Sequence, residues 1–419
     1  MNHNHSRLEE FHKKDLEERI KLVKKNSSIG ENIKKISKEG LTNKDADMMI
    51  ENVIGTYELP VGIATNFQIN GDDRLIPMVI EESSVVAAAS YGAKLARKTG
   101  GFKATVTEPV MISQIQVTGL SDPNASKLKV LEHKDELIEL ANEQDPVLVE
   151  HGGGAKDIRC RVLKNNFGHY LIVHLLVDCR DAMGANAVNT MAEALAPRIE
   201  SITGGKVYLR ILSNLADQRL GRARAVWKKE EIGEEVIEGI LHAYEFARVD
   251  PYRCATHNKG VMNGVSAVVM ATGNDTRAVE AGSHSYAASD GVYSPLTRWE
   301  KTEDGHLAGS IEMPVPVGII GGAASSHPVA QACLEIMDIE SAQELGEILV
   351  SVGLAQNFAA LRALASEGIQ KGHMKLHAKN LAIQVGAKKD EVDRVAKKMI
   401  EEGEVRVDRA EEILEELMD

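Results

Sequence analysis

The sequence predicts an α+β protein with three parts: a mostly helical large domain, a compact domain inserted into it, and a small helical flap at the C-terminus. Two observations support this prediction. Helical periodicity gives way to alternating strands near residue 109 and returns near residue 217. The predicted boundaries are 1–108 and 217–367 for the large domain, 109–216 for the inserted domain and 368–419 for the flap.

The inserted segment has the most regular pattern in the chain. Its expected elements are a strand at 112–117, a helix at 134–142, strands at 158–163 and 170–177, a helix at 187–202 and a strand at 207–211. This β-α-β-β-α-β order is that of the split βαβ, or ferredoxin-like, arrangement. The segment is therefore expected to fold as a compact domain of its own.

The remainder of the chain is expected to be largely helical. The pattern is helical up to about Gly101, and it includes the run 83–98, which begins with serine and stops at Gly100-Gly101. Later helices are expected at 235–249, 264–270, 276–288 and 342–365, with one strand at 306–314. Aromatic residues make up only 4% of the chain, so we expect a core of Ala, Val, Ile, Leu and Met. The last section has three charged helical runs separated by Gly372, Gly386 and Gly403, which favours a hinged unit.

Composition excludes several classes of partner. The net charge of −13 argues against a nucleic acid and against an anionic membrane surface. The 4 cysteines form no C-x-x-C pair, which disfavours a zinc knuckle or a disulfide framework and favours the cytoplasm. No apolar run approaches the roughly 18 residues that span a bilayer, and the N-terminus lacks the apolar stretch of a signal peptide. We expect a soluble, cytoplasmic protein without a metal site.

The stretch from Ala255 to Asp275 is the most informative motif. It places Lys259 among His257, Asn258 and Asn263, directly before an aliphatic run, and Asp275 follows that run. Burying an ammonium group is costly without a partner charge, so we expect a positioned, buried cation beside a carboxylate. Such a group stabilises the oxyanion that develops when a carbonyl or thioester is attacked. The alternative is an ordinary lysine at a helix start.

Two further motifs offer groups for proton transfer. Glu81 and Glu82 precede the serine-capped helix, and one of them could be a general acid or simply a helix N-terminal charge; spacing does not choose between them. His373 follows Gly372, and a movable imidazole suits proton delivery to a leaving group. A metal site with His377 is disfavoured because no third ligand is nearby.

A strand-to-helix connection offers a phosphate site. The residues Asp181, Ala182, Met183, Gly184, Ala185 and Asn186 lie where backbone N–H groups and a helix dipole favour a pyrophosphate. The segment lacks the G-x-G-x-x-G of a Rossmann turn, so a dinucleotide would be held by a different fold. The alternative is a plain glycine-containing connection.

Together these segments resemble the 3-hydroxy-3-methylglutaryl-coenzyme A (HMG-CoA) reductase family, and specifically its class II members. The matching strings are E-N-V-I-G, E-E-S-S-V-V-A-A-A-S, D-A-M-G-A-N, D-P-Y-R-C-A-T-H-N-K-G, A-T-G-N-D, G-L-A-Q-N and E-G-I-Q-K-G-H-M, which follow the family's order along nearly the whole chain. The resemblance implies reduction of HMG-CoA by two NAD(P)H to mevalonate and CoA, through mevaldyl-CoA and mevaldehyde. It also implies that the reaction is reversible.

The resemblance also assigns roles. The family's catalytic residues fall on Glu82, Lys259, Asp275 and His373: oxyanion stabilisation by Lys259, support of it by Asp275, protonation of mevaldehyde by Glu82 and protonation of the CoA thiolate by His373. Its substrate-binding residues fall on Arg253, Ser84, Asn263 and Asn357. Its nucleotide loop falls on residues 181–186.

For the cofactor, the resemblance favours NADH, with NADPH as the alternative. Asp145 matches an aspartate that NAD-preferring members place near the adenosine ribose. Family members can carry an arginine that binds the CoA phosphates at the position where this chain has His12. The resemblance therefore assigns no CoA contact to this position. The family forms homodimers or hexamers that are trimers of dimers, with Glu51 and Asn52 of the E-N-V-I-G segment at an interface and a shared active site.

Two other functions compete with this interpretation. An aldehyde or acyl-CoA dehydrogenase would need a nucleophilic cysteine, and none of the four cysteines has such a setting. A non-catalytic protein that kept the fold would bind CoA or a nucleotide without turnover. The presence of all four chemical groups at the matched positions counts against it.

Overall fold

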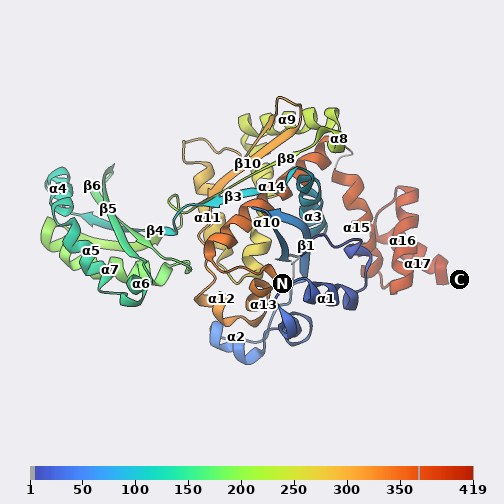
Figure 1. The fold of residues 1–419 in the computed structure, drawn as a ribbon, viewed down its shortest axis with the longest axis horizontal. Helices are drawn as coiled ribbons and strands as arrows, with labels where there is room; N and C mark the ends of the chain where they lie inside the picture. The colour runs from blue at the N-terminus through green and yellow to red at the C-terminus, as the bar shows by residue number, and fades with distance from the viewer. Residues whose placement is uncertain (1–4, 367–368, 419) are drawn as a thin grey trace.

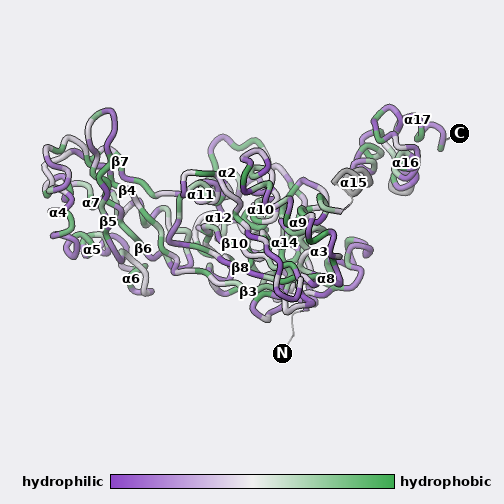
Figure 2. The backbone as a smooth tube through the Cα atoms, turned by 90° about the horizontal axis from the view of Figure 1, so that it is seen from above, coloured by the Kyte–Doolittle hydropathy of each residue, from purple (hydrophilic) through white to green (hydrophobic). Residues whose placement is uncertain are grey.

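The computed structural model describes residues 5–366 and 369–418, and within that part the side chains of residues 369–376, 389–390 and 418 are not described. Three bodies follow one another along the long axis of the molecule (Figures 1 and 2). Each has a hydrophobic core of its own. The largest core uses residues between Ala64 and Leu361, the second residues 111–216, and the third residues 378–414.

The central body is helical around two small sheets. Its helices are α1 (Leu16–Lys25), α2 (Asn43–Met49), α3 (Val85–Ala96), α8 (Lys229–Ile232), α9 (Glu234–Val249), α10 (Pro251–Ala271), α11 (Thr276–Ala287), α12 (Gly322–Ser326), α13 (Pro328–Met337) and α14 (Ala342–Ala365). Short turns of other helix types are η1 (Phe11–Lys13), η2 (Gly30–Asn32), η3 (Lys35–Glu39) and η4 (Arg97–Thr99).

A β-hairpin corrects the expectation that the chain is helical up to Gly101. Strands β1 (Val61–Ile69) and β2 (Asp72–Val79) pair antiparallel around Asn70-Gly71. Both turn residues have positive φ, 55° and 106°, which is the backbone that an Asn-Gly hairpin turn requires. The Asn-Gly pair between two apolar runs was the signal that the sequence offered.

A four-stranded sheet lies above the hairpin, where only one strand was expected. Its order is β3 (Lys103–Val106), β8 (Leu220–Trp227), β10 (Leu307–Pro314) and β9 (Thr297–Lys301), and every pair is antiparallel. Helix α14 contacts β3, β8 and β10. This helix is long and apolar enough to cross a membrane, but 67% of its apolar window is buried inside the protein, so it is a core helix.

Aromatic residues, although few, gather at the centre of this body. Trp227 stacks on Phe358 with ring centroids 4.4 Å apart, and Trp299 and Phe102 also contact Trp227. The Trp227 indole donates to the carbonyl of Gly92 at 3.0 Å, so its polar atom is satisfied in the core. The expectation of a purely aliphatic core was therefore wrong at its centre.

The inserted body confirms the predicted ferredoxin-like order. Its elements are β4 (Val110–Thr118), α4 (Pro123–Glu132), α5 (Lys134–Asn142), α6 (Pro146–Glu150), β5 (Gly154–Asn165), β6 (Gly168–Asp178), α7 (Ala185–Thr203) and β7 (Lys206–Ser213). The antiparallel sheet has the order β5-β6-β4-β7. The helix expected at 134–142 is confirmed as α5, and two helices that were not expected flank it, because Asp122-Pro123 and Asp145-Pro146 cap and start α4 and α6.

A buried arginine links the inserted body to the central body through hydrogen bonds. Arg219 has only 1% of its surface exposed, and its guanidinium donates to the carbonyls of Ala182 at 3.0 Å and Val317 at 2.5 Å. Burial lowers the pKa of Arg219 to about 10, with a smaller opposite effect from nearby anionic groups. The guanidinium thus joins the loop after β6 to the segment after β10.

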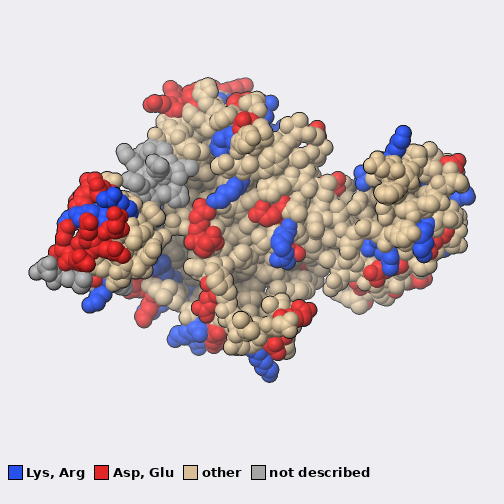
Figure 3. Space-filling view, turned by 180° about the vertical axis from the view of Figure 1, so that it is seen from behind, with Lys and Arg blue, Asp and Glu red and all other residues tan. Residues whose placement is uncertain are grey.

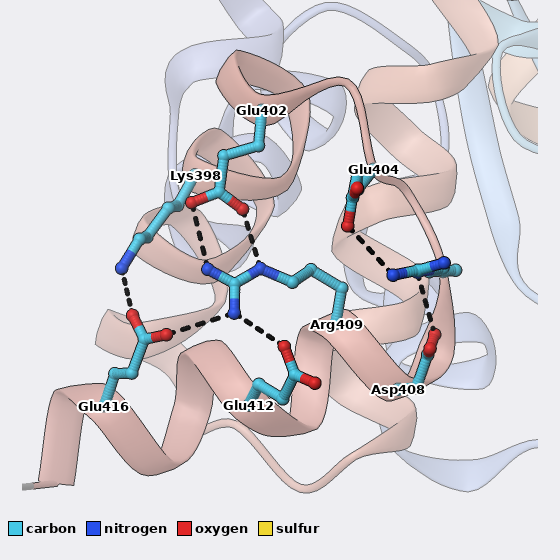
Figure 4. Close-up of polar contacts among 8 residues, drawn as sticks. Lys398, Glu402, Glu404, Asp408, Arg409, Glu412 and Glu416 are labelled. Carbon is cyan, nitrogen blue, oxygen red and sulfur yellow. Dashed lines mark hydrogen bonds and ion pairs between the residues drawn. The ribbon is translucent and has the colours of Figure 1, made fainter.

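The C-terminal body is a bundle of three helices, α15 (Ile369–Gln384), α16 (Lys389–Glu402) and α17 (Val407–Met418). Gly372 lies inside α15, so the hinge expected there is wrong; Gly386 and Gly403, with positive φ, do separate helices. Arg409 joins α16 to α17 through ion pairs with Glu402, Glu412 and Glu416 (Figure 4). From behind, acidic side chains surround basic ones at this end of the molecule (Figure 3).

Candidate active site

Helix α10 positions the candidate lysine. Asp250 caps the helix by accepting a hydrogen bond from the Arg253 amide at 2.7 Å, and Pro251 occupies the first helical position. Lys259 therefore lies inside a long helix rather than before one, which corrects the expected local structure. Glycine and alanine at many α10 positions allow α14 to pack closely against it.

Lys259 pairs with Glu82, which lies just before α3. The Lys259 Nζ is 2.7 Å from the Glu82 Oε2, across 177 residues of sequence. This contact distinguishes Glu82 from Glu81, a choice that the sequence left open. The lysine side chain is 57% exposed in the single chain and the glutamate 35%, so the expected buried cation is instead an accessible one. The pair is open to a ligand from the solvent side.

Ser84 begins α3 in an unusual backbone conformation. Its φ is 74°, in the left-handed region, and its side chain makes no capping hydrogen bond. A non-glycine residue in this region costs on the order of 1–3 kcal/mol and is common at functional sites. The serine hydroxyl, two residues from Glu82, is therefore free to contact a ligand.

Asp275 does not join Lys259 and Glu82 within one chain. It caps α11, accepting from the amides of Arg277 at 3.0 Å and Ala278 at 3.1 Å, and is exposed. Lys259 is twelve residues before the end of α10 at Ala271, a separation of about 18 Å at 1.5 Å per residue. Helical side chains also tilt toward the N-terminus, so Lys259 points away from Asp275.

Asp275 lies instead beside the predicted nucleotide loop. Its neighbour Asn274 exchanges two hydrogen bonds with the backbone of Gly318, at 2.8 and 3.0 Å. A Cβ placed on Gly318 would meet the Met183 amide nitrogen at 2.5 Å, so this glycine allows the loop 181–186 to pack against it. The structure thus gathers the candidate residues into two groups at opposite ends of α10.

We call these groups the lysine half-site and the loop half-site. The lysine half-site comprises Glu82, Ser84, Arg253 and Lys259, and the loop half-site comprises Asp275 and residues 181–186.

The loop half-site can hold a phosphate group. Gly184 precedes α7 with φ 97° and makes no side-chain cap, so the first amides of a 19-residue helix remain available. A Cβ on Gly184 would meet the Cys179 Sγ at 2.2 Å, which explains the glycine. The loop is also anchored to the first residue of α14, because the Asp181 carboxylate accepts a hydrogen bond from the Ala342 amide at 2.8 Å.

Asp145 lies near this loop. Its Oδ1 caps α6 by accepting from the Leu148 amide at 3.0 Å. Burial raises the pKa of the Cys179 thiol to about 12, and the charges of Asp178 and Asp145 add to the increase.

The remaining substrate candidates differ in their surroundings. Arg253 is half-buried, and desolvation lowers its pKa. Asn263 lies one turn after Lys259 on the same face of α10. Asn357 is buried, and its amide is occupied by the His257 carbonyl at 3.2 Å, the Thr297 hydroxyl at 2.9 Å and Trp299. Its intrachain partners favour a role in holding α10.

His373 belongs to α15, but its side chain lies outside the described residues. His377, four residues on, is exposed. In the described part of the chain, no group of three or more His, Cys, Asp or Glu side chains could hold a metal ion.

Sequence reasoning named His257 and Asn258 only as neighbours of Lys259, yet both are structural. His257 is 1% exposed; its Nε2 contacts the Thr297 hydroxyl at 2.7 Å, and its Nδ1 has no hydrogen-bond partner. Burial lowers the pKa of this imidazole to about 3. Asn258 holds the segment before β9 through the carbonyl of Ser294 and the amide of Leu296. Together they fix the helix turn that carries Lys259.

The fold and the two half-sites define a class of protein: an enzyme that can polarise a carbonyl group with an amine–carboxylate pair and hold a nucleotide at a helix terminus. Residues 15–378 match the family model of hydroxymethylglutaryl-coenzyme A reductase. A protein of that name from Archaeoglobus fulgidus is 59% identical over 98% of this chain and 95% of its own length. The probable enzyme from Borreliella burgdorferi is 38% identical over 80% of this chain and 77% of its own.

Solved structures agree. The class II reductase from Streptococcus pneumoniae, bound to NADPH in open conformations, has a TM-score of 0.82 and 40% identity, covering 97% of this chain and all of that one. The chain therefore belongs to the hydroxymethylglutaryl-coenzyme A reductase family. Its activity is that of an HMG-CoA reductase, an NAD(P)-dependent oxidoreductase of the mevalonate pathway.

Proposed function

We propose that each catalytic centre of this reductase is assembled from the lysine half-site of one chain and the loop half-site of a second copy. The observation that supports this proposal is the separation of Lys259 from Asp275 by the length of α10. A twofold axis across the middle of α10 would bring the lysine end of each copy to the loop end of the other, as an isologous dimer requires.

The surface around the loop end of α10 supports an interface. A cavity of about 700 Å³ there is lined by Met270, Ala271 and Gly273 together with residues of the segment 49–59. That segment contains the E-N-V-I-G motif, and its Ile54 and Tyr57 are almost fully exposed. Large exposed apolar side chains clustered in one place are typical of protein–protein contacts. Glu51 and Asn52, the latter with φ 58°, are then interface residues.

In this centre Lys259 stabilises the negative charge on the thioester oxygen and afterwards polarises the aldehyde. Glu82, already 2.7 Å from the ammonium, supplies the proton as the aldehyde becomes an alcohol. Asp275 of the second copy holds Lys259 in place. Arg253, Ser84 and Asn263 contact the hydroxymethylglutaryl group, with the Arg253 guanidinium on its carboxylate. Asn357 supports these residues indirectly, because its side-chain amide donates a hydrogen bond to the His257 carbonyl of α10.

The nicotinamide cofactor supplies hydride when bound. Residues 181–186 hold its phosphates at the start of α7, whose uncapped amides suit that role.

Each of the three domains then has its own role. The large domain (1–108 and 217–367) binds HMG-CoA and forms the dimer, the inserted domain (109–216) binds the nucleotide, and residues 368–419 form a C-terminal flap. His373, on the flap, protonates the departing CoA thiolate. All four cysteines are buried and free, in keeping with action in the cytoplasm.

We infer that the enzyme prefers NADH, because the Asp145 carboxylate can accept from a ribose diol and repels a 2′-phosphate. Asp145→Asn is the sharpest test: asparagine also caps a helix, so α6 is preserved while the charge is lost. Steady-state kcat/KM should then fall for NADH and rise for NADPH, changing their ratio roughly tenfold or more. An NADPH preference in the unaltered enzyme, or an unchanged ratio in the variant, would refute the assignment.

A further inference from the structure

The outward face of the β3-β8-β10-β9 sheet carries a groove that contains none of the candidate catalytic or nucleotide residues. Its volume is about 840 Å³, and its floor is formed by side chains that alternate with the buried residues of these strands. Its wall comes from the end of α11 and the segment 289–296. A space of this size accommodates a small organic ligand.

One cross-strand row in this groove is unusually basic. Lys103 on β3 pairs with Arg224 on β8, Arg224 pairs with Ser310 on β10, and Ser310 pairs with Arg298 on β9. All three cationic residues are exposed, in a chain whose net charge is −13. Among the residues that the structure describes, no ion pair joins Lys103, Arg224 or Arg298 to a carboxylate. Directly opposed like charges such as Lys103 and Arg224 destabilise a sheet unless something compensates them.

In the neighbouring cross-strand row, a carboxylate compensates the charge of the arginine. Arg222, two residues before Arg224, faces Glu312 across the same pair of strands and forms an ion pair with it. The Tyr286 hydroxyl also donates to that carboxylate. At the equivalent place opposite Arg224 the chain has Ser310, a neutral hydroxyl. The carboxylate is thus supplied in one row and absent from the next.

We propose that this groove is a binding site for a small polyanion that carries a diphosphate group. Adjacent strands are about 4.8 Å apart, so Lys103 and Arg224 are one strand spacing apart and Arg224 and Arg298 two. A single phosphate can reach only part of this row, whereas linked phosphates contact two or three cations at once. Arginine forks bind phosphate oxygens in pairs, and the Ser310 hydroxyl can donate between them.

Calorimetric titration of inorganic pyrophosphate tests the proposal on the full-length enzyme saturated with NADH and CoA, in the absence of divalent cations. Saturation fills the phosphate sites of the established reaction, so added pyrophosphate reports on the groove. The expected result is one site per chain that binds pyrophosphate more tightly than orthophosphate and weakens as salt rises. Absence of binding, or equal affinity for the two anions, would overturn the proposal.

Two substitutions at Ser310 form a matched pair. Ser310→Glu gives Arg224 and Arg298 an internal carboxylate and should abolish pyrophosphate binding, whereas Ser310→Gln, of similar size but neutral, should retain it. Equal binding by both variants would show that the cations are not the ligands.

Arg224→Gln supplies an independent readout. It should weaken pyrophosphate binding about tenfold or more, since a charged hydrogen bond is lost. In the absence of anions it should leave the melting temperature unchanged or raise it, because one of two opposed like charges is removed. A lower melting temperature would mean that the row is a structural feature, and the binding assignment would fail.

Discussion

The two ends of helix α10 carry different halves of the chemistry. In its first half, Lys259 is paired with Glu82, which lies two residues before Ser84, a residue with left-handed backbone. After its last turn, Asp275 lies beside the loop of residues 181–186, and its ion pair is with Arg277. Neither end has all the groups that the reaction needs. Under the proposed function, one chain carries two half-sites, and a second copy completes each of them.

The largest effect is expected when the charge of Lys259 is removed from the lysine half-site. Lys259→Met keeps the length of the side chain but removes the charge, so kcat for HMG-CoA should fall roughly hundredfold or more, as expected for the loss of a donor worth about 3 kcal/mol. Lys301→Met is the matched control, because Lys301 also forms a 2.7 Å ion pair, with Glu238, and is similarly exposed. Surface pairs contribute little, so its turnover should be unchanged. A similar loss in both variants would contradict the role of Lys259.

A smaller effect concerns the turn that holds Lys259. Burial lowers the pKa of the His257 imidazole from its ordinary value of 6.5 to about 3 in the folded protein. The unfolded chain therefore binds a proton below pH 6.5 that the folded chain does not, and stability should fall as pH decreases from 6.5 toward 3. The contribution is at most about 1.4 kcal/mol per pH unit.

Urea unfolding at pH 7 and pH 5 measures this effect through Trp227 and Trp299, the chain's 2 tryptophans, both in the central core. His257→Gln should reduce the difference in unfolding free energy between the two pH values. His377→Gln, at an exposed position on α15, should leave it as it is. An unchanged pH dependence in the His257 variant would show that another group is responsible.

The smallest effect is local to the flap. Arg409 is 16% exposed and pairs with three carboxylates, whereas the neighbouring Arg406 is 59% exposed and pairs with Glu404 and Asp408 (Figure 4). Arg409→Met should therefore accelerate amide hydrogen exchange in α17, and Arg406→Met should not. Mevaldehyde reduction, which needs no thiolate protonation, should be retained in both. Uniform exchange in the two variants would mean that Arg409 does not join α16 to α17.

Patterns that depend on local periodicity were predictable from the sequence. The inserted domain was predicted in the correct order because its strands and helices alternate cleanly and are separated by recognisable caps. The hairpin at β1 and β2 was missed, although Asn70-Gly71 marks its turn, because a helical pattern was extended over it. Strand β8 was missed although Arg222 and Arg224 alternate with the buried Ala223 and Ala225, because alanine is a weak strand former.

The residues of the candidate site were proposed from the sequence, but their arrangement could not be predicted from it. The resemblance identified Glu82 and Lys259, and the structure places them in contact. The exposure of Lys259 depends on which face of α10 is covered by α3 and α14. Such packing brings together residues far apart in sequence, so periodicity does not reveal it.

Mixing two inactive subunits tests the shared active site most directly. Lys259→Met and Asp275→Asn chains with different tags are co-expressed, and the mixed dimers are purified and assayed with HMG-CoA. If each centre takes Lys259 from one copy and Asp275 from the other, one centre of the mixed dimer contains both unaltered residues. Each mixed dimer should then show about half of the wild-type activity. Activity no higher than that of either variant alone would contradict it.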